Sequence, residues 1–148
     1  MSIPSSLKVY KTLTPPFIIG VLIVVIHLIP VTGLDSSSWW SEIHLDKIVH
    51  VFAFAFFSLS ISIAFTKLRL FLYKTPVLMM IILVGCTGFG TILEIIQGEL
   101  IDGRTADFLD IVADCAGSIL GFIAFRGVYG VFPGQIPPDV LISNSRIS

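Results

Sequence analysis

Four apolar stretches, joined by short polar connections, constrain the fold of this chain more than any other feature. They cover about 17–29, 47–66, 76–97 and 107–125. A helix needs about 20 mainly apolar residues to cross a bilayer; the last three stretches are about that long, and the first becomes so with its flank to about Leu34. Hydrophobic residues make up 55% of the chain and the mean hydropathy is +0.96. The sequence therefore predicts an all-α polytopic membrane protein, a four-helix transmembrane bundle with short loops.

The regions outside these stretches carry little structure of their own. The N-terminal segment is basic, and Pro15 and Pro16 fit the first turn of a helix. A basic start before an apolar run also resembles a secretory signal, but no small-x-small cleavage site precedes Asp35, so we expect an uncleaved first span. We expect three regions: 1–16 as an N-terminal segment, 17–125 as the four-span domain, and 126–148 as a proline-containing tail without a span.

The distribution of Lys and Arg predicts the orientation. Two of the nine, Lys47 and Arg104, fall on one side of the expected bundle. The other seven fall on the opposite side: Lys8, Lys11, Lys67, Arg69, Lys74, Arg126 and Arg146. Cytoplasmic connections are enriched in Lys and Arg. We therefore expect a multi-pass protein of the cell (inner) membrane with both termini cytoplasmic, and nine of the ten acidic residues in the outer half.

The fourth stretch carries polar residues at helical spacing. Asp107, Asp110, Asp114, Gly117 and Gly121 follow one another at intervals of three, four, three and four residues, which places them on one face of a helix. A charged side chain in hydrocarbon costs about 2.5–3.5 kcal/mol on insertion scales. Asp114 would lie about 10 Å below Asp107 at 1.5 Å per residue. These acids are therefore the first candidates for a functional site, and the two glycines predict a helix-packing surface.

Three expected helix ends converge on the outer side and bring further polar residues to the same place. We expect a pocket or polar network formed by Asp46, Lys47, His50, Glu94, Gln97, Arg104, Asp107, Asp110 and Asp114. Five of these are acids, against two permanent cations and one histidine. Because ion pairing leaves an excess of negative charge, a carboxyl is protonated, water enters, or a cation binds.

Two interpretations of this set remain open from the residues alone. Clustered carboxyls in a partly dry pocket suit ligand binding or acid-base chemistry. The same residues also suit a structural network that locks three helices together, with Arg104 bridging carboxylates. Asp107 has a further structural use, because an aspartate at a helix N-terminus caps it.

Other kinds of chemistry find less support. No Ser or Thr stands in a glycine-elbow context, and no glycine-rich phosphate loop is present, so we assign no catalytic residue. Neither His-x3-His nor Cys-x2-Cys occurs, so we expect no metal and no cofactor, although His50 with the acids is a conceivable metal site. His27 and His44 fit an interior polar filler and an interface residue. The net charge of −1 gives no reason to expect a nucleic-acid partner.

The ordered polar residues resemble the VanZ-like family of small bacterial membrane proteins. The resemblance covers about residues 17–125 and is carried by Asp46-Lys47-x2-His50 with Phe54, Glu94-x2-Gln97, Arg104, Asp110, Asp114 and Gly117-x3-Gly121. The family often has an aromatic residue where this chain has Val51, and commonly an asparagine where Asp114 stands. The resemblance implies a multi-span envelope protein, whose founding member is associated with teicoplanin (glycopeptide) resistance.

Three functions remain open at this point. The first is an outward-facing acidic pocket that binds or processes a lipid-linked envelope component or a cationic amphiphile. The second is an accessory or structural subunit of a larger membrane complex, and the third is a cation or proton conduit. The partners to expect are membrane lipids and, for the second function, other membrane protein subunits. Four spans without two matching halves argue against a transporter that acts as a monomer.

Overall fold

The computed structural model describes residues 6–28, 45–70, 74–100 and 107–135. Four helices make up nearly all of this part: α1 (Ser6–Leu28), α3 (Leu45–Lys67), α4 (Thr75–Leu100) and α5 (Phe108–Tyr129). Each is long and apolar enough to cross a membrane, and no strand occurs among the described residues. The prediction of an all-α protein with four candidate spans is confirmed.

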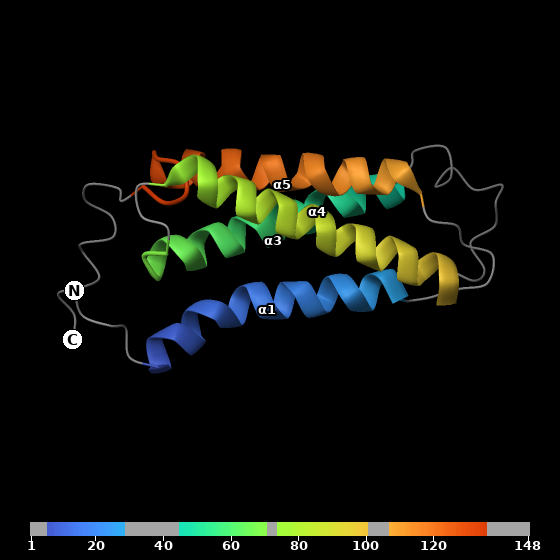
Figure 1. Cartoon of the computed structure of the whole chain (residues 1–148), viewed down its shortest axis with the longest axis horizontal. Coiled ribbons are helices and arrows are strands. Elements are labelled where there is room, and N and C mark those ends of the chain that lie inside the picture. The colour runs from blue at the N-terminus through green and yellow to red at the C-terminus, as the bar shows by residue number, and fades with distance from the viewer. Residues whose placement is uncertain (1–5, 29–44, 71–73, 101–106, 136–148) are drawn as a thin grey trace.

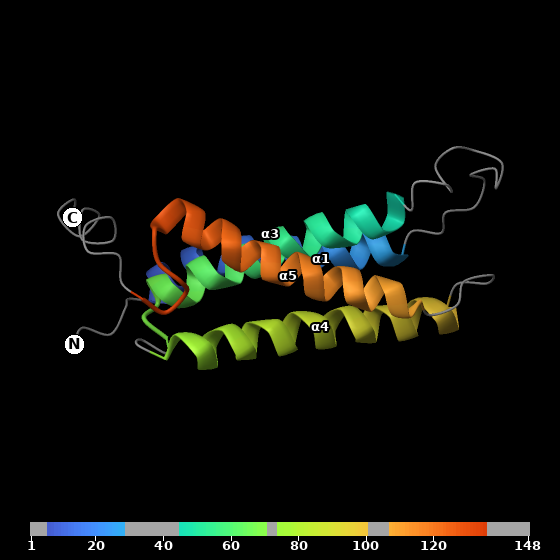
Figure 2. The ribbon, with the colours of Figure 1, turned by 90° about the horizontal axis from the view of Figure 1, so that it is seen from above.

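Consecutive helices run in opposite directions along the bundle, so that each end of the bundle is built from four helix termini (Figure 1). α3 and α5 form the most extensively packed pair, α4 packs mainly on α5, and α1 packs mainly on α3. In Figure 2, α4 runs beside the crossing α3–α5 pair, and α1 lies behind that pair. Because consecutive helices are antiparallel, the last turns of α1 and α4 lie at the same end of the bundle as the first turns of α3 and α5.

Small residues bring α3 and α5 into close contact. A Cβ atom at Gly117 would overlap the backbone carbonyl of Val51, and one at Gly121 would overlap Ser58 and the backbone of Ala55. The hydroxyl of Ser58 donates to the carbonyl oxygen of Ser118 at 2.9 Å, across the same interface. Close backbone approach with interhelical hydrogen bonds is how helices associate where lipid removes the hydrophobic driving force.

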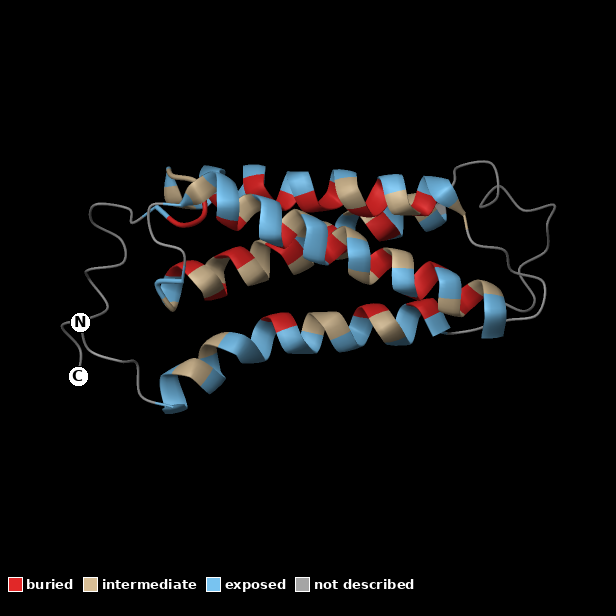
Figure 3. Cartoon of the chain, viewed as in Figure 1, coloured by how far each residue is buried: buried red, intermediate tan, exposed pale blue. Residues whose placement is uncertain are grey.

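The burial pattern matches a bundle whose solvent is lipid. Apolar side chains form the core, and Phe54 at its centre is fully buried against the rings of Phe57 and Phe89. The outward surface is apolar too, with Phe52 60% and Met80 68% exposed. Figure 3 shows the buried residues on the inward faces and the exposed residues on the outward faces of the helices. In water such a surface would drive aggregation, whereas acyl chains solvate it.

The N-terminal helix begins earlier than the apolar pattern indicates. α1 starts at Ser6, before Pro15 and Pro16, so the two prolines lie inside the helix rather than in its first turn. A proline within a helix removes a backbone hydrogen bond and bends the axis, and α1 bends in its first half in Figure 1. The helix can nevertheless begin at Ser6 because residues 6–14 contain no glycine or proline to stop it.

The other end of the described chain turns back onto the bundle. α5 ends at Gly130, which adopts the left-handed conformation (φ 70°) and donates its N–H to the carbonyl of Arg126. Gly134 then donates its N–H to the hydroxyl of Thr66 on α3 at 3.1 Å. Residues 130–135 thus close the end of the bundle that lies opposite the polar residues of α5, and the remainder of the predicted tail lies outside the described residues.

Candidate functional site

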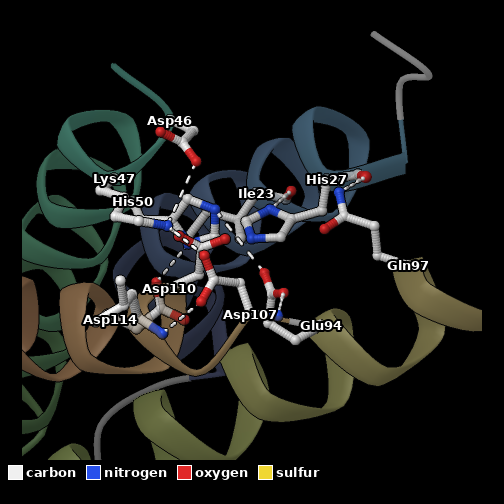
Figure 4. Close-up of polar contacts among 11 residues, drawn as sticks. Ile23, His27, Asp46, Lys47, His50, Glu94, Gln97, Asp107, Asp110 and Asp114 are labelled. Carbon is white, nitrogen blue, oxygen red and sulfur yellow. Dashed lines mark hydrogen bonds and ion pairs between the residues drawn. The ribbon is translucent and has the colours of Figure 1, made fainter. Parts of the chain in front are cut away.

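Polar side chains from all four helices meet at one end of the bundle (Figure 4). They lie in the last turn of α1, the first turns of α3, the last turns of α4 and the first two turns of α5. We call this set the polar cluster; it consists of His27, Asp46, Lys47, His50, Glu94, Gln97, Asp107, Asp110 and Asp114. Arg104, which the sequence places with them, lies outside the described residues.

The three aspartates of α5 descend from the rim of the cluster into its interior. Asp107 is the N-cap, and its side chain accepts a hydrogen bond from the N–H of Leu109 at 2.8 Å. The exposed fraction of the side chain falls from 43% at Asp107 to 12% at Asp110 and 0% at Asp114. The helical spacing of these residues therefore produces a graded line of carboxylates, exposed at one end and fully buried at the other.

Lys47 is the cation at the rim. Its Nζ lies 2.6 Å from Asp107 Oδ2 and 2.6 Å from Asp110 Oδ1, and 3.5 Å from the carboxylate of Asp46. The side chain thus ties the first turn of α3 to the first turn of α5. In one of the two interpretations left open by the sequence, Arg104 bridges carboxylates; Arg104 lies outside the described residues, so that role stays a prediction. Among the described residues, Lys47 bridges Asp107 and Asp110.

His50 occupies the interior, one turn below Lys47 on α3. Its Nδ1–H donates to Asp114 Oδ1 at 2.8 Å, and both residues are buried. Gly90 on α4 makes room for that carboxylate, since a Cβ atom there would overlap Asp114. The glycine thus lets α4 approach α5 where the histidine and the aspartate pair.

Glu94 is the second fully buried acid of the cluster, with 1% of its surface exposed. Its Oε2 accepts a hydrogen bond from the backbone N–H of Asp107 at 3.3 Å. Its Oε1 lies 3.9 Å from His50 Nε2, too far for a hydrogen bond. Within the described residues, Oε1 of Glu94 and Oδ2 of Asp114 are buried without a hydrogen-bond partner. A buried carboxylate oxygen in this state is costly.

His27 of α1 belongs to the cluster although the sequence analysis placed it outside. Its Nδ1 lies 2.8 Å from the carbonyl oxygen of Ile23, and its ring packs edge to face on His50 with centroids 4.6 Å apart. Gln97 of α4 donates to the carbonyl oxygen of His27 at 2.6 Å. One feature of the sequence could have indicated this: His27 is the one ionisable residue in the first apolar stretch, and it lies near the end of that stretch that meets the other polar residues.

The described cluster contains more carboxylates than cations. Five acids face the single ammonium group of Lys47 and two histidines. Lys47 contacts three acids at the rim, so the two innermost, Glu94 and Asp114, have only imidazoles as basic neighbours among the described side chains. The interior of the cluster is therefore rich in hydrogen-bond acceptors and can take up a positively charged or hydrogen-donating group.

The two remaining predicted residues, Gly117 and Gly121, lie deeper along α5 and contact α3 rather than the cluster. They set the distance between the two helices that carry Lys47, His50 and the three aspartates. Their place in the fold is thus to position the site, and they contribute no chemistry to it.

Comparison with known proteins establishes the family. The model of the VanZ/LLP1 family matches residues 5–131. The chain belongs to the VanZ/LLP1 family. The match covers all four helices, so the whole polar cluster lies within the VanZ domain. No curated protein and no solved structure matches the chain. Family membership and the four candidate spans together make it a multi-pass membrane protein.

Proposed function

We propose that this VanZ-family protein binds, with its polar cluster, the amine- or hydroxyl-bearing headgroup of a lipid-linked component of the bacterial envelope. The observation that carries the proposal is the graded line of carboxylates on α5, which begins at an exposed rim and ends beside buried acceptor oxygens on Asp114 and Glu94. Carboxylates only accept hydrogen bonds when ionised, so ammonium and hydroxyl groups are the complementary ligand chemistry.

The distribution of basic residues supports an outward orientation of the cluster. Within the described chain, six of the seven Lys and Arg residues lie at or near the opposite helix ends, and Lys47 is the exception: the six are Lys8, Lys11, Lys67, Arg69, Lys74 and Arg126. Such a bias favours that end as cytoplasmic. The rim would then face the compartment in which lipid-linked envelope precursors are used, with the acyl chains of the ligand lying along the apolar outer surface of the helices.

A conduit for protons or cations receives less support from the same residues. Beyond His50 on the inward face of α3 comes Phe54, which is fully buried. The hydroxyls that follow are engaged with backbone carbonyls: Ser58 donates to Ser118 and Ser62 donates to Ser58. On α5, Ser118 lies one turn from Asp114, and its hydroxyl is engaged in the same way, donating to the backbone carbonyl of Asp114 at 2.8 Å. These described hydroxyls thus hold their protons on backbone carbonyls rather than on one another.

The proposal is tested by removing the charge of single buried acids. We expect Glu94→Gln and Asp110→Asn to insert normally but to lose both the co-purifying envelope lipid, detected by native mass spectrometry, and any protection of a sensitive host against teicoplanin. Glu99→Gln is the matched control, because Glu99 is an exposed acid on the same helix as Glu94. Lipid retention and protection in both cluster variants at wild-type levels would contradict the proposal.

A further inference from the structure

Three buried residues of the polar cluster come from three different helices and point toward one another. His27 of α1, His50 of α3 and Glu94 of α4 each offer one ligand atom, and these atoms all lie within 4.8 Å of one another. The residues are 4%, 8% and 1% exposed. Figure 4 shows the two imidazole rings and the Glu94 carboxylate facing a common point.

The hydrogen bonds of the two imidazoles define their tautomers. A carbonyl oxygen can only accept, so Nδ1 of His27 carries the proton that is donated to Ile23. His50 likewise uses Nδ1–H toward the carboxylate of Asp114. In each neutral ring Nε2 then carries the lone pair that a metal ion binds. Metal-binding histidines almost always donate their other N–H to a carboxylate or a backbone carbonyl, and these two rings show one partner of each kind.

Glu94 supplies the independent observation. Its Oε1 is buried without a hydrogen-bond partner among the described residues and lies 3.9 Å from His50 Nε2. That separation is too long for a hydrogen bond, but it is near the spacing of about 3.4 Å between two ligands of one tetrahedral Zn²⁺ at bond lengths near 2.1 Å. A divalent cation between the two atoms would satisfy the carboxylate oxygen.

We propose that His27, His50 and Glu94 bind one divalent transition-metal ion of the Zn²⁺ class. Two imidazoles and one carboxylate suit this ion, and three protein ligands leave a fourth position open. Asp114 accepts the Nδ1–H of His50 and thereby orients the ring so that Nε2 faces the ion. The cation also offsets part of the carboxylate excess of the cluster. The inference goes beyond the proposed function and does not depend on it, because the ion is held by residues of this chain alone. With Oε1 of Glu94 on the ion, the buried acceptor left to a headgroup is Oδ2 of Asp114. Glu94→Gln then affects both proposals, whereas Asp110→Asn keeps all three metal ligands and tests the headgroup alone.

The test uses the full chain purified in detergent, stripped with a chelator and titrated with Zn²⁺ alone. We expect one Zn²⁺ per chain, and an X-ray absorption spectrum with imidazole and oxygen scatterers at about 2.0–2.2 Å and no sulfur at about 2.3 Å. Asp114→Asn should weaken binding by about 10- to 100-fold, as for partners that orient a metal ligand. His27→Gln and Glu94→Gln should weaken it further, whereas Glu99→Gln should leave it unchanged.

Two outcomes would overturn the inference. One is the absence of stoichiometric Zn²⁺ binding by the wild-type chain when its helical circular dichroism is intact, a result that leaves the lipid measurement on the same preparation unaffected. The other is retention of Zn²⁺ in the His27→Gln/Glu94→Gln double variant, or a sulfur ligand in the spectrum. Because the wild-type spectrum is read directly, the inference stays testable even if a variant fails to fold.

Discussion

Lys47 has more ionic partners than any other residue of the polar cluster. It contacts Asp46, Asp107 and Asp110, and its own side chain is only 19% exposed. Removing Lys47 takes the cation away from the carboxylate of Asp110, whose side chain is 12% exposed, so the energetic effect exceeds that of a surface ion pair. At the scale of single residues, one ammonium group therefore joins these three acids among the residues that the structure describes.

We predict that Lys47→Met lowers the stability of the detergent-solubilised chain by about 1–3 kcal/mol, mainly the cost of leaving the buried carboxylate of Asp110 without its cation. Thermal unfolding followed by circular dichroism measures it. Lys67→Met is the control, because Lys67 is exposed at the other end of the same helix.

A double-mutant cycle with Asp110→Asn separates the ion pair from other effects of this substitution. If the two residues act through their contact, Asp110→Asn lowers the free energy of unfolding less in the Lys47→Met background than in the wild type. Purely additive losses would show that the 2.6 Å contact contributes nothing to stability.

At the scale of helices, the contact between α3 and α5 positions the site. These two helices carry six of the nine residues of the polar cluster, namely Asp46, Lys47, His50, Asp107, Asp110 and Asp114. Their separation is determined deeper in the bundle, where Gly117 and Gly121 leave no space for a side chain. A change in the packing at Gly117 should therefore alter the geometry of the cluster, because Asp114 lies about one helical turn away.

We predict that Gly117→Ala destabilises the bundle by about 1–3 kcal/mol, because the added methyl group meets backbone that cannot rotate away. Gly127→Ala on the same helix is the control, since a Cβ atom there meets nothing within 4 Å. The control gains the helix propensity of alanine without the clash. Equal thermal stability of the two variants would mean that α3 and α5 are not in close contact in the membrane.

At the scale of the whole molecule, the separation of acidic and basic ends predicts a single orientation. We expect the cluster end of α4 to be accessible from outside the cell and its other end from the cytoplasm. In a Cys86→Ala/Cys115→Ala background, Glu99→Cys should react with a membrane-impermeant maleimide in intact cells. Lys74→Cys should react only after permeabilisation. The reverse pattern would place the cluster in the cytoplasmic half and remove the support that orientation gives to the proposed ligand.

Most of the architecture could be predicted because it depends on one-dimensional signals. Apolar length identifies the helices, and helical spacing groups Asp107, Asp110 and Asp114 on one face. The predicted start of α1 was wrong, because transmembrane helices tolerate proline in their interior as well as in their first turn. The membership of His27 could not be predicted from spacing, since its partners come from α3 and α4 and a site drawn from several helices has no spacing pattern along the chain; only its depth in the first apolar stretch pointed to it.

The buried ring of Phe54 bears on how well the membrane around this chain holds an ion gradient. A membrane that stores an ion gradient loses it through any continuous series of charged or hydroxylated groups, and this chain places deeply buried carboxylates in one half and a hydroxyl series in the other. On α3 the ring of Phe54 stands between the two, and on α5 the hydroxyl of Ser118 is tied to the backbone carbonyl of Asp114. We expect this arrangement to keep the charged centre from serving as a path for ions across the hydrocarbon layer.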